Sequence, residues 1–166
     1  MTTKNVLDVN KVLDVKSLLE QTVSSTVMLP PLSSKSGLFH LSMKPLKLKS
    51  MSPRVPDNFL VKHGYEDAKT KRISFTPSID SALMAMSSNL KDKVLYVYAA
   101  PNNTPFVEPS VSQVPDSGIT KERWVLEPVQ VYLIGKIKVS DATDETFTYK
   151  YGNNTAELYA WNWKKC

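Results

Sequence analysis

The chain has 166 residues, of which 42% are hydrophobic and 22% are charged, and its formal net charge is +5 at pH 7. These values predict a folded domain with a core of ordinary size, and they exclude disordered and fibrous proteins. No apolar run reaches the roughly 18 residues of a membrane span, and no apolar leader follows Met1. The only cysteine, Cys166, cannot form a disulfide within the chain. We therefore expect a cytoplasmic protein without a membrane partner.

The excess of positive charge lies in one segment. Residues 35–72 contain nine Lys or Arg and three Asp or Glu, a net charge of +6, and the other residues sum to −1. Such a segment can attract a phosphate-bearing ligand or a nucleic acid. Lysines that only keep the surface solvated are the commoner explanation, and the sequence leaves both open.

Residues 1–32 are expected to form a helical appendage, followed by a single domain over residues 33–166. Two consecutive prolines at 30–31 end any regular element there. A helix over about residues 10–22 is favoured because apolar residues recur at helical spacing. These residues are Val12, Val15, Leu19 and Val23.

A short strand is predicted over residues 37–42, in which His40 lies between apolar neighbours. Alternation places His40 on one face with Leu38 and Ser42, and Phe39 with Leu41 on the other. A histidine in such a strand is more often a hydrogen-bonded core residue than a ligand contact, and both roles are kept.

Residues 43–70 show little periodicity, and we expect them to form a long, mobile, basic loop that acts as a lid or a binding loop. Pro53 and Pro56 fix the backbone on both sides of Arg54, so its guanidinium can be presented to a phosphate or a carboxylate. An Arg54 that is merely solvated in a rigid turn fits the sequence equally well. No spacing joins His40 or His63 to further metal ligands, so no metal is expected.

A strand that runs directly into a capped helix is predicted between residues 72 and 90. Ile73 and Phe75 alternate with polar residues, as in a strand with two unlike faces. Thr76 is a suitable N-cap before Pro77, and Ser78 is a competing cap. A polar strand end before a helix can hold an anion, although a tight core junction is an equally good interpretation. The apolar stripe of the helix is Ile79, Ala82, Leu83, Met86 and Leu90.

The second half of the chain is expected to be rich in strands. One is predicted over residues 93–100, with Tyr96 and Tyr98 on one face, and others at about 122–126 and 129–139, where Gly135 marks a bulge or bend. Residues 146–151 and 156–163 read as a hairpin around residues 152–154. The predicted fold class is α+β with a mainly antiparallel sheet.

Three polar positions stand out because each lies on a predicted strand between apolar residues. They are His40, Ser74 with Thr76, and Glu122. Alternation places Glu122 beside Trp124, whose indole would partly desolvate the carboxylate. A desolvated carboxylate suits the stabilisation of a developing cation.

The order of these residues resembles that of the ADP-ribosyltransferase superfamily, over about residues 38–139. The resemblance implies a split, mainly antiparallel sheet with one central helix, and NAD as the substrate. By this resemblance His40 would hold a ribose hydroxyl, and Ser74 or Thr76 would support the nicotinamide side of the pocket. Glu122 would stabilise the oxocarbenium-like transition state after nicotinamide leaves.

The chain is also similar to small proteins of phages and mobile elements, from Pro-Arg-Val-Pro at residues 53–56 to Trp-Val-Leu-Glu-Pro-Val at residues 124–129. This similarity implies a macromolecular acceptor in a host cytoplasm, with a protein favoured. It leaves a monomer and a small homo-oligomer both open.

Two departures from the family pattern matter. The helix after Ser78 lacks the two tyrosines that enclose nicotinamide in toxin-like members, so Tyr65 or Tyr96 would have to replace them. Position 120 is Thr, so the second Glu of the arginine-modifying pattern is absent, which argues against transfer to arginine.

The competing hypothesis is a non-enzymatic accessory protein that binds a host protein or nucleic acid through its basic segment. A structural subunit that assembles through the N-terminal helix is a third.

Overall fold

The structure is a computed structural model, and it describes residues 35–47, 50–86 and 89–166. The predicted N-terminal helix and the domain border at residue 32 lie outside these residues. The described elements follow one another as β1 (Phe39–Ser42), β2 (Ser50–Met51), α2 (Phe59–Lys62), β3 (Ile73–Phe75), α3 (Ile79–Ala85), β4 (Val94–Ala99), α4 (Ser117–Thr120), β5 (Arg123–Val125), β6 (Val129–Gln130), β7 (Tyr132–Tyr151) and β8 (Asn154–Lys165).

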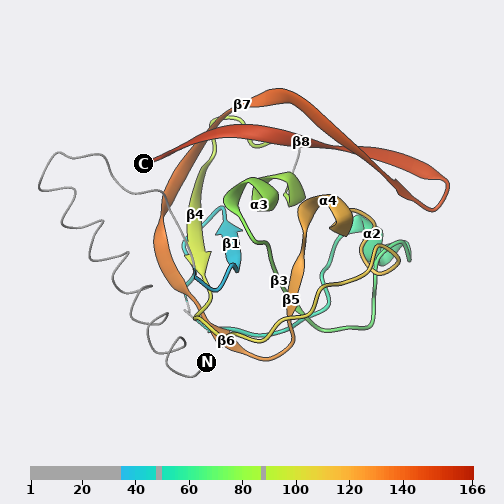
Figure 1. Cartoon of the computed structure of the whole chain (residues 1–166), viewed down its shortest axis with the longest axis horizontal. Helices are drawn as coiled ribbons and strands as arrows, with labels where there is room; N and C mark the ends of the chain where they lie inside the picture. Colours follow the sequence, from blue (N-terminus) through green and yellow to red (C-terminus); the bar gives the residue numbers. More distant parts are fainter. Residues whose placement is uncertain (1–34, 48–49, 87–88) are drawn as a thin grey trace, which may run out of the picture.

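The fold is α+β, and all its paired strands are antiparallel. One sheet has four strands in the order β1-β4-β7-β8, and β2-β6 and β3-β5 form two separate pairs. Helix α3 lies in the middle of the molecule, where it packs against β8 and β1 (Figure 1). No helix in the described ranges is long and apolar enough to cross a membrane.

Two hydrophobic cores lie on the two faces of β1 and β4, as the alternation of the sequence predicts. Phe39 and Leu41 belong to the first core, which contains Ile79 and Leu83 of α3. Leu38 belongs to the second core, together with the apolar side chains of β3 and β5. His40 shares the face of Leu38, so its side chain is directed toward β3 and not toward α3.

The junction between β3 and α3 differs in detail from the prediction. Ser78 is the N-cap, and its Oγ accepts a hydrogen bond from the Ser81 amide at 3.1 Å. Thr76 is therefore not the cap, and its Oγ1 donates to the Ser78 carbonyl at 2.9 Å. The helix ends at Ala85, so it does not extend to Leu90, which is nevertheless fully buried in the first core.

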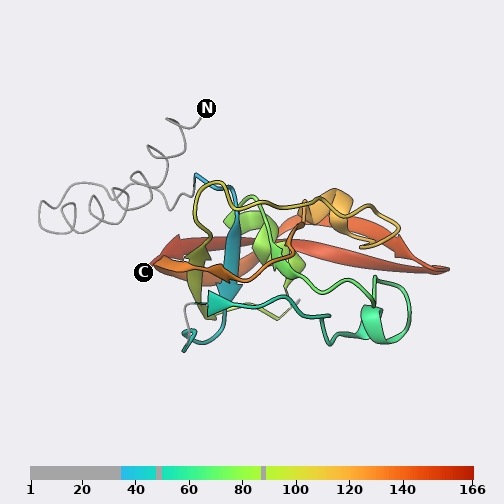
Figure 2. The same ribbon diagram turned by 90° about the horizontal axis from the view of Figure 1, so that it is seen from below.

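The predicted strand at 129–139 is divided, because Val129–Gln130 forms β6 and pairs with β2. The rest of it continues through the predicted strand at 146–151 as one long strand, β7, with register shifts between Val139 and Thr146. Gly135 lies beside another register shift, opposite β4, as predicted. The hairpin to β8 turns at Gly152, whose φ is +58°. We call its distal half, residues 146–159, the arm. In Figure 1 the arm passes along the side of the molecule where α4 and α2 lie, and in Figure 2 these two helices appear on opposite sides of the arm.

The segment 43–70, predicted to be an aperiodic loop, contains regular structure. It includes β2 and α2, and Arg54 forms an isolated antiparallel bridge with Arg72. Asn58 caps α2, because its Oδ1 accepts a hydrogen bond from the Val61 amide at 2.9 Å. Sequence periodicity could not predict these short elements, because a single turn or a two-residue strand has no repeat to detect.

Candidate functional site

A cleft of about 420 Å³ lies between the ends of β1 and β3, helix α3, the α2 segment and the arm. Apolar side chains of α3 and the arm form part of its wall, including Ala82, Met86 and Leu158. Its polar lining comes from segments that are far apart in the sequence: His40, Glu66, Ser74, Thr76, Asp116 and Glu122. The cleft therefore brings together the four strand residues that the sequence singled out, and it adds two carboxyl groups.

Glu122 is held by two hydrogen bonds to the same carboxylate oxygen. The Ser74 hydroxyl donates to Oε1 at 2.6 Å, and the Trp124 indole nitrogen donates to it at 2.7 Å. The pairing of β3 with β5 explains this arrangement, because Ser74 lies directly opposite Trp124 in the register. In the part of the chain that the structure describes, no residue donates a hydrogen bond to the other oxygen, Oε2.

His40 lies on the neighbouring strand, with its Nδ1 3.3 Å from the Ser74 carbonyl oxygen. Burial lowers the pKa of His40, the hydrogen bond to Ser74 opposes this shift, and the positive charge of Arg54 lowers the pKa further. The imidazole therefore favours its neutral form. In the tautomer that donates from Nδ1 to Ser74, Nε2 is a free acceptor.

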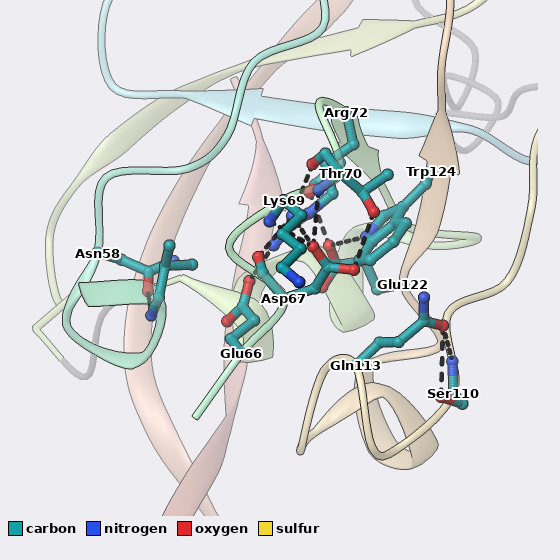
Figure 3. Close-up of polar contacts among 12 residues, drawn as sticks. Asn58, Glu66, Asp67, Lys69, Thr70, Arg72, Ser110, Gln113, Glu122 and Trp124 are labelled. Carbon is teal, nitrogen blue, oxygen red and sulfur yellow. Dashed lines mark hydrogen bonds and ion pairs between the residues drawn. The ribbon is translucent and has the colours of Figure 1, made fainter. Parts of the chain in front are cut away.

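Behind Glu122, the guanidinium of Arg72 is completely buried (Figure 3). Both of its terminal nitrogens donate hydrogen bonds, whereas its Nε has no partner among the described residues. It donates to Glu66 Oε1 at 2.6 Å and to the carbonyl oxygens of Asp67 and Thr70 at 2.9 Å each. It also lies over the indole of Trp124, which is itself 1% exposed. Arg72 was counted as part of the basic segment, but its charge is neutralised inside the protein and cannot reach a partner.

The cleft is acidic although the protein is basic. Burial raises the pKa of Asp116 to about 6, and the negative charges of Glu122 and Glu66 contribute to this shift. Burial also raises the pKa of Glu66, against the lowering effect of its hydrogen bond with Arg72. Sequence reasoning missed both carboxyl groups because they lie in segments without periodicity, one after α2 and one at the start of α4.

Three predicted contacts lie outside the cleft lining. Arg54 does not line it, although its charge acts on His40. Tyr65 packs instead against the turn of the arm, with its ring centroid 5.1 Å from that of Tyr151. Tyr96 packs against the second core, because it shares the face of Tyr98 on β4 as the alternation requires.

The cleft contains other aromatic rings than the predicted tyrosines. Phe59 of α2 and Tyr149 of the arm both line it. Phe59 is 57% exposed and stacks on His63, with 4.2 Å between the ring centroids. The only signal in the sequence was the position of Phe59 after Pro56, inside a segment that was assigned to a loop.

The chain matches no protein-family model, no curated protein and no solved structure. The interpretation of the cleft therefore depends on its own residues and their geometry.

Proposed function

We propose that the protein binds NAD in this cleft, cleaves the bond between nicotinamide and ribose, and transfers ADP-ribose to a macromolecular acceptor. The observation that carries the proposal is the fixed carboxylate of Glu122, held through one oxygen by Ser74 and Trp124, in the same cleft as His40. The volume of about 420 Å³ falls in the range of roughly 300–1,000 Å³ that is usual for ligand sites.

The chemistry follows from the charge that develops on the ribose. When nicotinamide departs with the bonding electron pair, the anomeric carbon becomes positive, and a fixed carboxylate stabilises this state more than the ground state. Ser74 and Trp124 both occupy Oε1 of Glu122, so Oε2 remains available to the ribose. Neither donor has to reorganise during the reaction, which is the condition for efficient electrostatic stabilisation.

The remaining residues are assigned supporting roles. Neutral His40 accepts a hydrogen bond from a ribose hydroxyl through Nε2, and Phe59 or Tyr149 offers an aromatic face to the nicotinamide ring. Thr76 has an indirect role, in which it holds the end of strand β3 in place. Its backbone pairs with Phe39, and its hydroxyl donates to the Ser78 carbonyl. Arg54, near His40, is the candidate partner for the phosphates.

The proposal includes a split ADP-ribosyltransferase-like sheet. Its support is the separate β3-β5 pair, which belongs to a different sheet from β1 and is linked to β1 by the isolated bridge between Phe39 and Thr76 and by the contact of His40 with the Ser74 carbonyl. It also retains a host macromolecule in the cytoplasm as the acceptor. The non-enzymatic alternative has less support, because Arg72 is buried in ion pairs and Lys62 is paired with Asp57 at 2.9 Å.

The test is to incubate the protein with labelled NAD and to follow binding, nicotinamide release and label transfer. Glu122→Gln keeps the shape of the side chain and removes its charge, so nicotinamide release should fall by about 10²–10³-fold while NAD binding persists. Glu127→Gln, which removes an exposed carboxylate outside the cleft, is the matched control and should act as wild type. Wild-type protein that neither binds nor cleaves NAD would refute the function and favour the binding protein.

A further inference from the structure

The three carboxyl groups of the cleft are not equivalent. Glu122 is held by Ser74 and Trp124, and Glu66 is held by Arg72. Asp116 lies at the N-cap position of α4, yet its side chain makes no capping hydrogen bond. Among the described residues, only its own backbone amide donates a hydrogen bond to the carboxyl.

This lack of a cap is informative because an Asp at an N-cap normally accepts a hydrogen bond from the first turn of its helix. Here first-turn amides are satisfied by backbone oxygens instead: the Ser117 amide donates to the Val114 carbonyl at 3.0 Å, and the Ile119 amide donates to the Asp116 carbonyl at 2.9 Å. The carboxyl of Asp116 is thus not needed by the helix, and it lines the cleft together with Glu122.

We propose that Asp116 is the base that accepts the proton of an uncharged hydroxyl nucleophile as this nucleophile attacks the ribose carbon released by nicotinamide. The inference deepens the proposed function and depends on it. Glu122 and Asp116 then divide the work: the first stabilises the cation, and the second activates the group that captures it.

The step is balanced without a further reactant. The bond between the ribose carbon and the nicotinamide nitrogen breaks, and nicotinamide leaves with the electron pair. The hydroxyl oxygen of the acceptor forms the new bond to the ribose carbon, and its proton passes to the carboxylate of Asp116. One positive charge disappears from the pyridinium ring, and one proton is released when Asp116 is deprotonated again.

The surroundings of Asp116 match this role. The charged and titratable groups that share the cleft with it are Glu122, Glu66, Tyr149 and the neutral His40. Burial and the two neighbouring glutamates raise its pKa to about 6, so it is ionised at neutral pH and still basic enough to take a proton.

The same geometry argues for a hydroxyl acceptor over a guanidinium. A guanidinium is best bound by a carboxylate that is free to form a paired, bidentate contact. Glu66 is already engaged by Arg72, and Thr120, two residues before Glu122, is completely buried and has no carboxylate. Asp116 is the carboxylate left to bind a guanidinium, and such a contact would occupy the group that has to accept the proton. A hydroxyl brings no charge into the cleft and leaves Asp116 free to accept the proton.

The first experiment measures nicotinamide release to water between pH 5 and pH 8. The wild-type rate should rise with pH through about 6 and then level off. Asp116→Asn should lower the plateau by about 10²-fold or more, as for other general bases, and should remove the rise. Asp141→Asn, at an exposed site on β7 where Asp141 pairs with Lys91, is the matched control and should keep the wild-type profile.

The second experiment replaces the hydroxyl with azide, an anion that attacks without losing a proton. Azide should restore nicotinamide release in Asp116→Asn but not in Glu122→Gln, which still lacks the charge that stabilises the cation. Wild-type turnover that Asp116→Asn leaves unchanged in rate and pH profile would overturn the inference about Asp116 and leave the proposed function intact. If free arginine raises the wild-type rate of nicotinamide release above the rate with water alone, the proposal of a hydroxyl acceptor is wrong. Absence of NAD cleavage in the wild type would overturn both proposals together.

Discussion

The guanidinium of Arg72 lies over the indole of Trp124, with its central carbon 4.3 Å from the ring centroid. Trp124 in turn donates its indole N–H to Glu122, and Arg72 donates to Glu66. One buried cation thus supports two carboxylates of the cleft, one directly and one through an aromatic ring. Arg72 directly precedes β3, and Glu122 directly precedes β5, which carries Trp124. The two strands are paired to each other, so their register fixes this arrangement.

Replacement of Arg72 by Met should destabilise the protein by about 3–5 kcal/mol, because it leaves the buried carboxylate of Glu66 without its partner. Urea unfolding followed by circular dichroism measures the change. Lys62→Met removes an exposed ion pair with Asp57 and should cost no more than about 1 kcal/mol. Addition of Glu66→Gln to Arg72→Met should recover part of the loss. Equal effects of Arg72→Met and Lys62→Met would contradict a structural role for the buried cation.

Replacement of Trp124 by Phe should slow nicotinamide release by about tenfold or more, because a hydrogen bond to a charged group is worth roughly 1.5–3 kcal/mol. The variant keeps an aromatic ring beneath Arg72 and removes only the donor to Glu122. Trp163→Phe is the matched control, since the Trp163 indole N–H donates to Asp80 at 2.8 Å outside the cleft. Steady-state rates of the two variants should differ clearly, and equal rates would remove Trp124 from the mechanism.

Replacement of Asp116 by Asn should stabilise the protein above pH 6. The folded-state pKa of Asp116 is raised from 3.8 to about 6, so the folded protein binds the proton more tightly than the unfolded chain does. The wild type therefore loses stability as the pH rises from about 4 to about 6, and the variant does not. The gain should be on the order of 1–2 kcal/mol, after a discount for the partial exposure of the side chain.

The free energy of unfolding, measured at pH 4 and pH 8, checks this prediction without any ligand. The gain should be present at pH 8 and nearly absent at pH 4. A pH-independent difference, or a variant less stable than the wild type at pH 8, would show that Asp116 is not held in an unfavourable environment.

Replacement of His40 by Ala should weaken NAD binding by about 2- to 12-fold, the equivalent of one hydrogen bond of roughly 0.5–1.5 kcal/mol. In the wild type, binding should also weaken as the pH falls through the pKa of His40, which lies below 6.5, because a protonated imidazole has no acceptor. Titration calorimetry at several pH values measures both effects. If NAD binding by His40→Ala keeps the same pH dependence, the titrating group is not His40.

Replacement of Gly152 by Ala should disturb the contact between the arm and Tyr65. Gly152 has a positive φ, and a Cβ atom there would lie 2.7 Å from the Tyr65 ring. Gly64→Ala separates the two effects, because Gly64 has a φ of +74° and open space around its Cβ position. We expect about 1–2 kcal/mol of destabilisation from the backbone alone at Gly64 and a larger loss at Gly152. Similar melting temperatures for both variants would show that Tyr65 moves aside freely.

The sequence predicted the regular strands well, because alternation reports burial directly. Strand β4 lies where its β-branched and aromatic residues placed it, and Trp161 and Trp163 both lie against the first core. The predicted length of β7 was wrong because polar residues interrupt its alternation of apolar and polar positions. The register shifts between Val139 and Thr146 keep that polar stretch within the strand. Gly135 marks the register shift opposite β4 in the sequence, whereas the shifts opposite β8 fall in a stretch without glycine and depend on the pairing of the two strands.

The candidate site was predictable where its residues lie on strands and not elsewhere. His40, Ser74 and Glu122 were visible as polar residues in apolar surroundings. Asp116 is placed by the turn of α4, whose four residues have no period, and Tyr149 lines the cleft only because the arm folds back over it. One usable signal was overlooked: a buried position at 72 occupied by Arg requires an acidic partner, and Glu66 precedes it by six residues.

The arm and the cleft place different demands on the folding chain. Strands β7 and β8 are joined by a two-residue turn, so their pairing closes a short loop and loses little chain entropy. The cleft instead joins His40 to Leu158, and its central hydrogen bond, from Ser74 to Glu122, spans 48 residues. Contacts of such separation form slowly compared with local ones. Far-UV circular dichroism during refolding will therefore recover before ligand binding does, and the interval between the two signals measures the time in which the hairpin exists without a functional site.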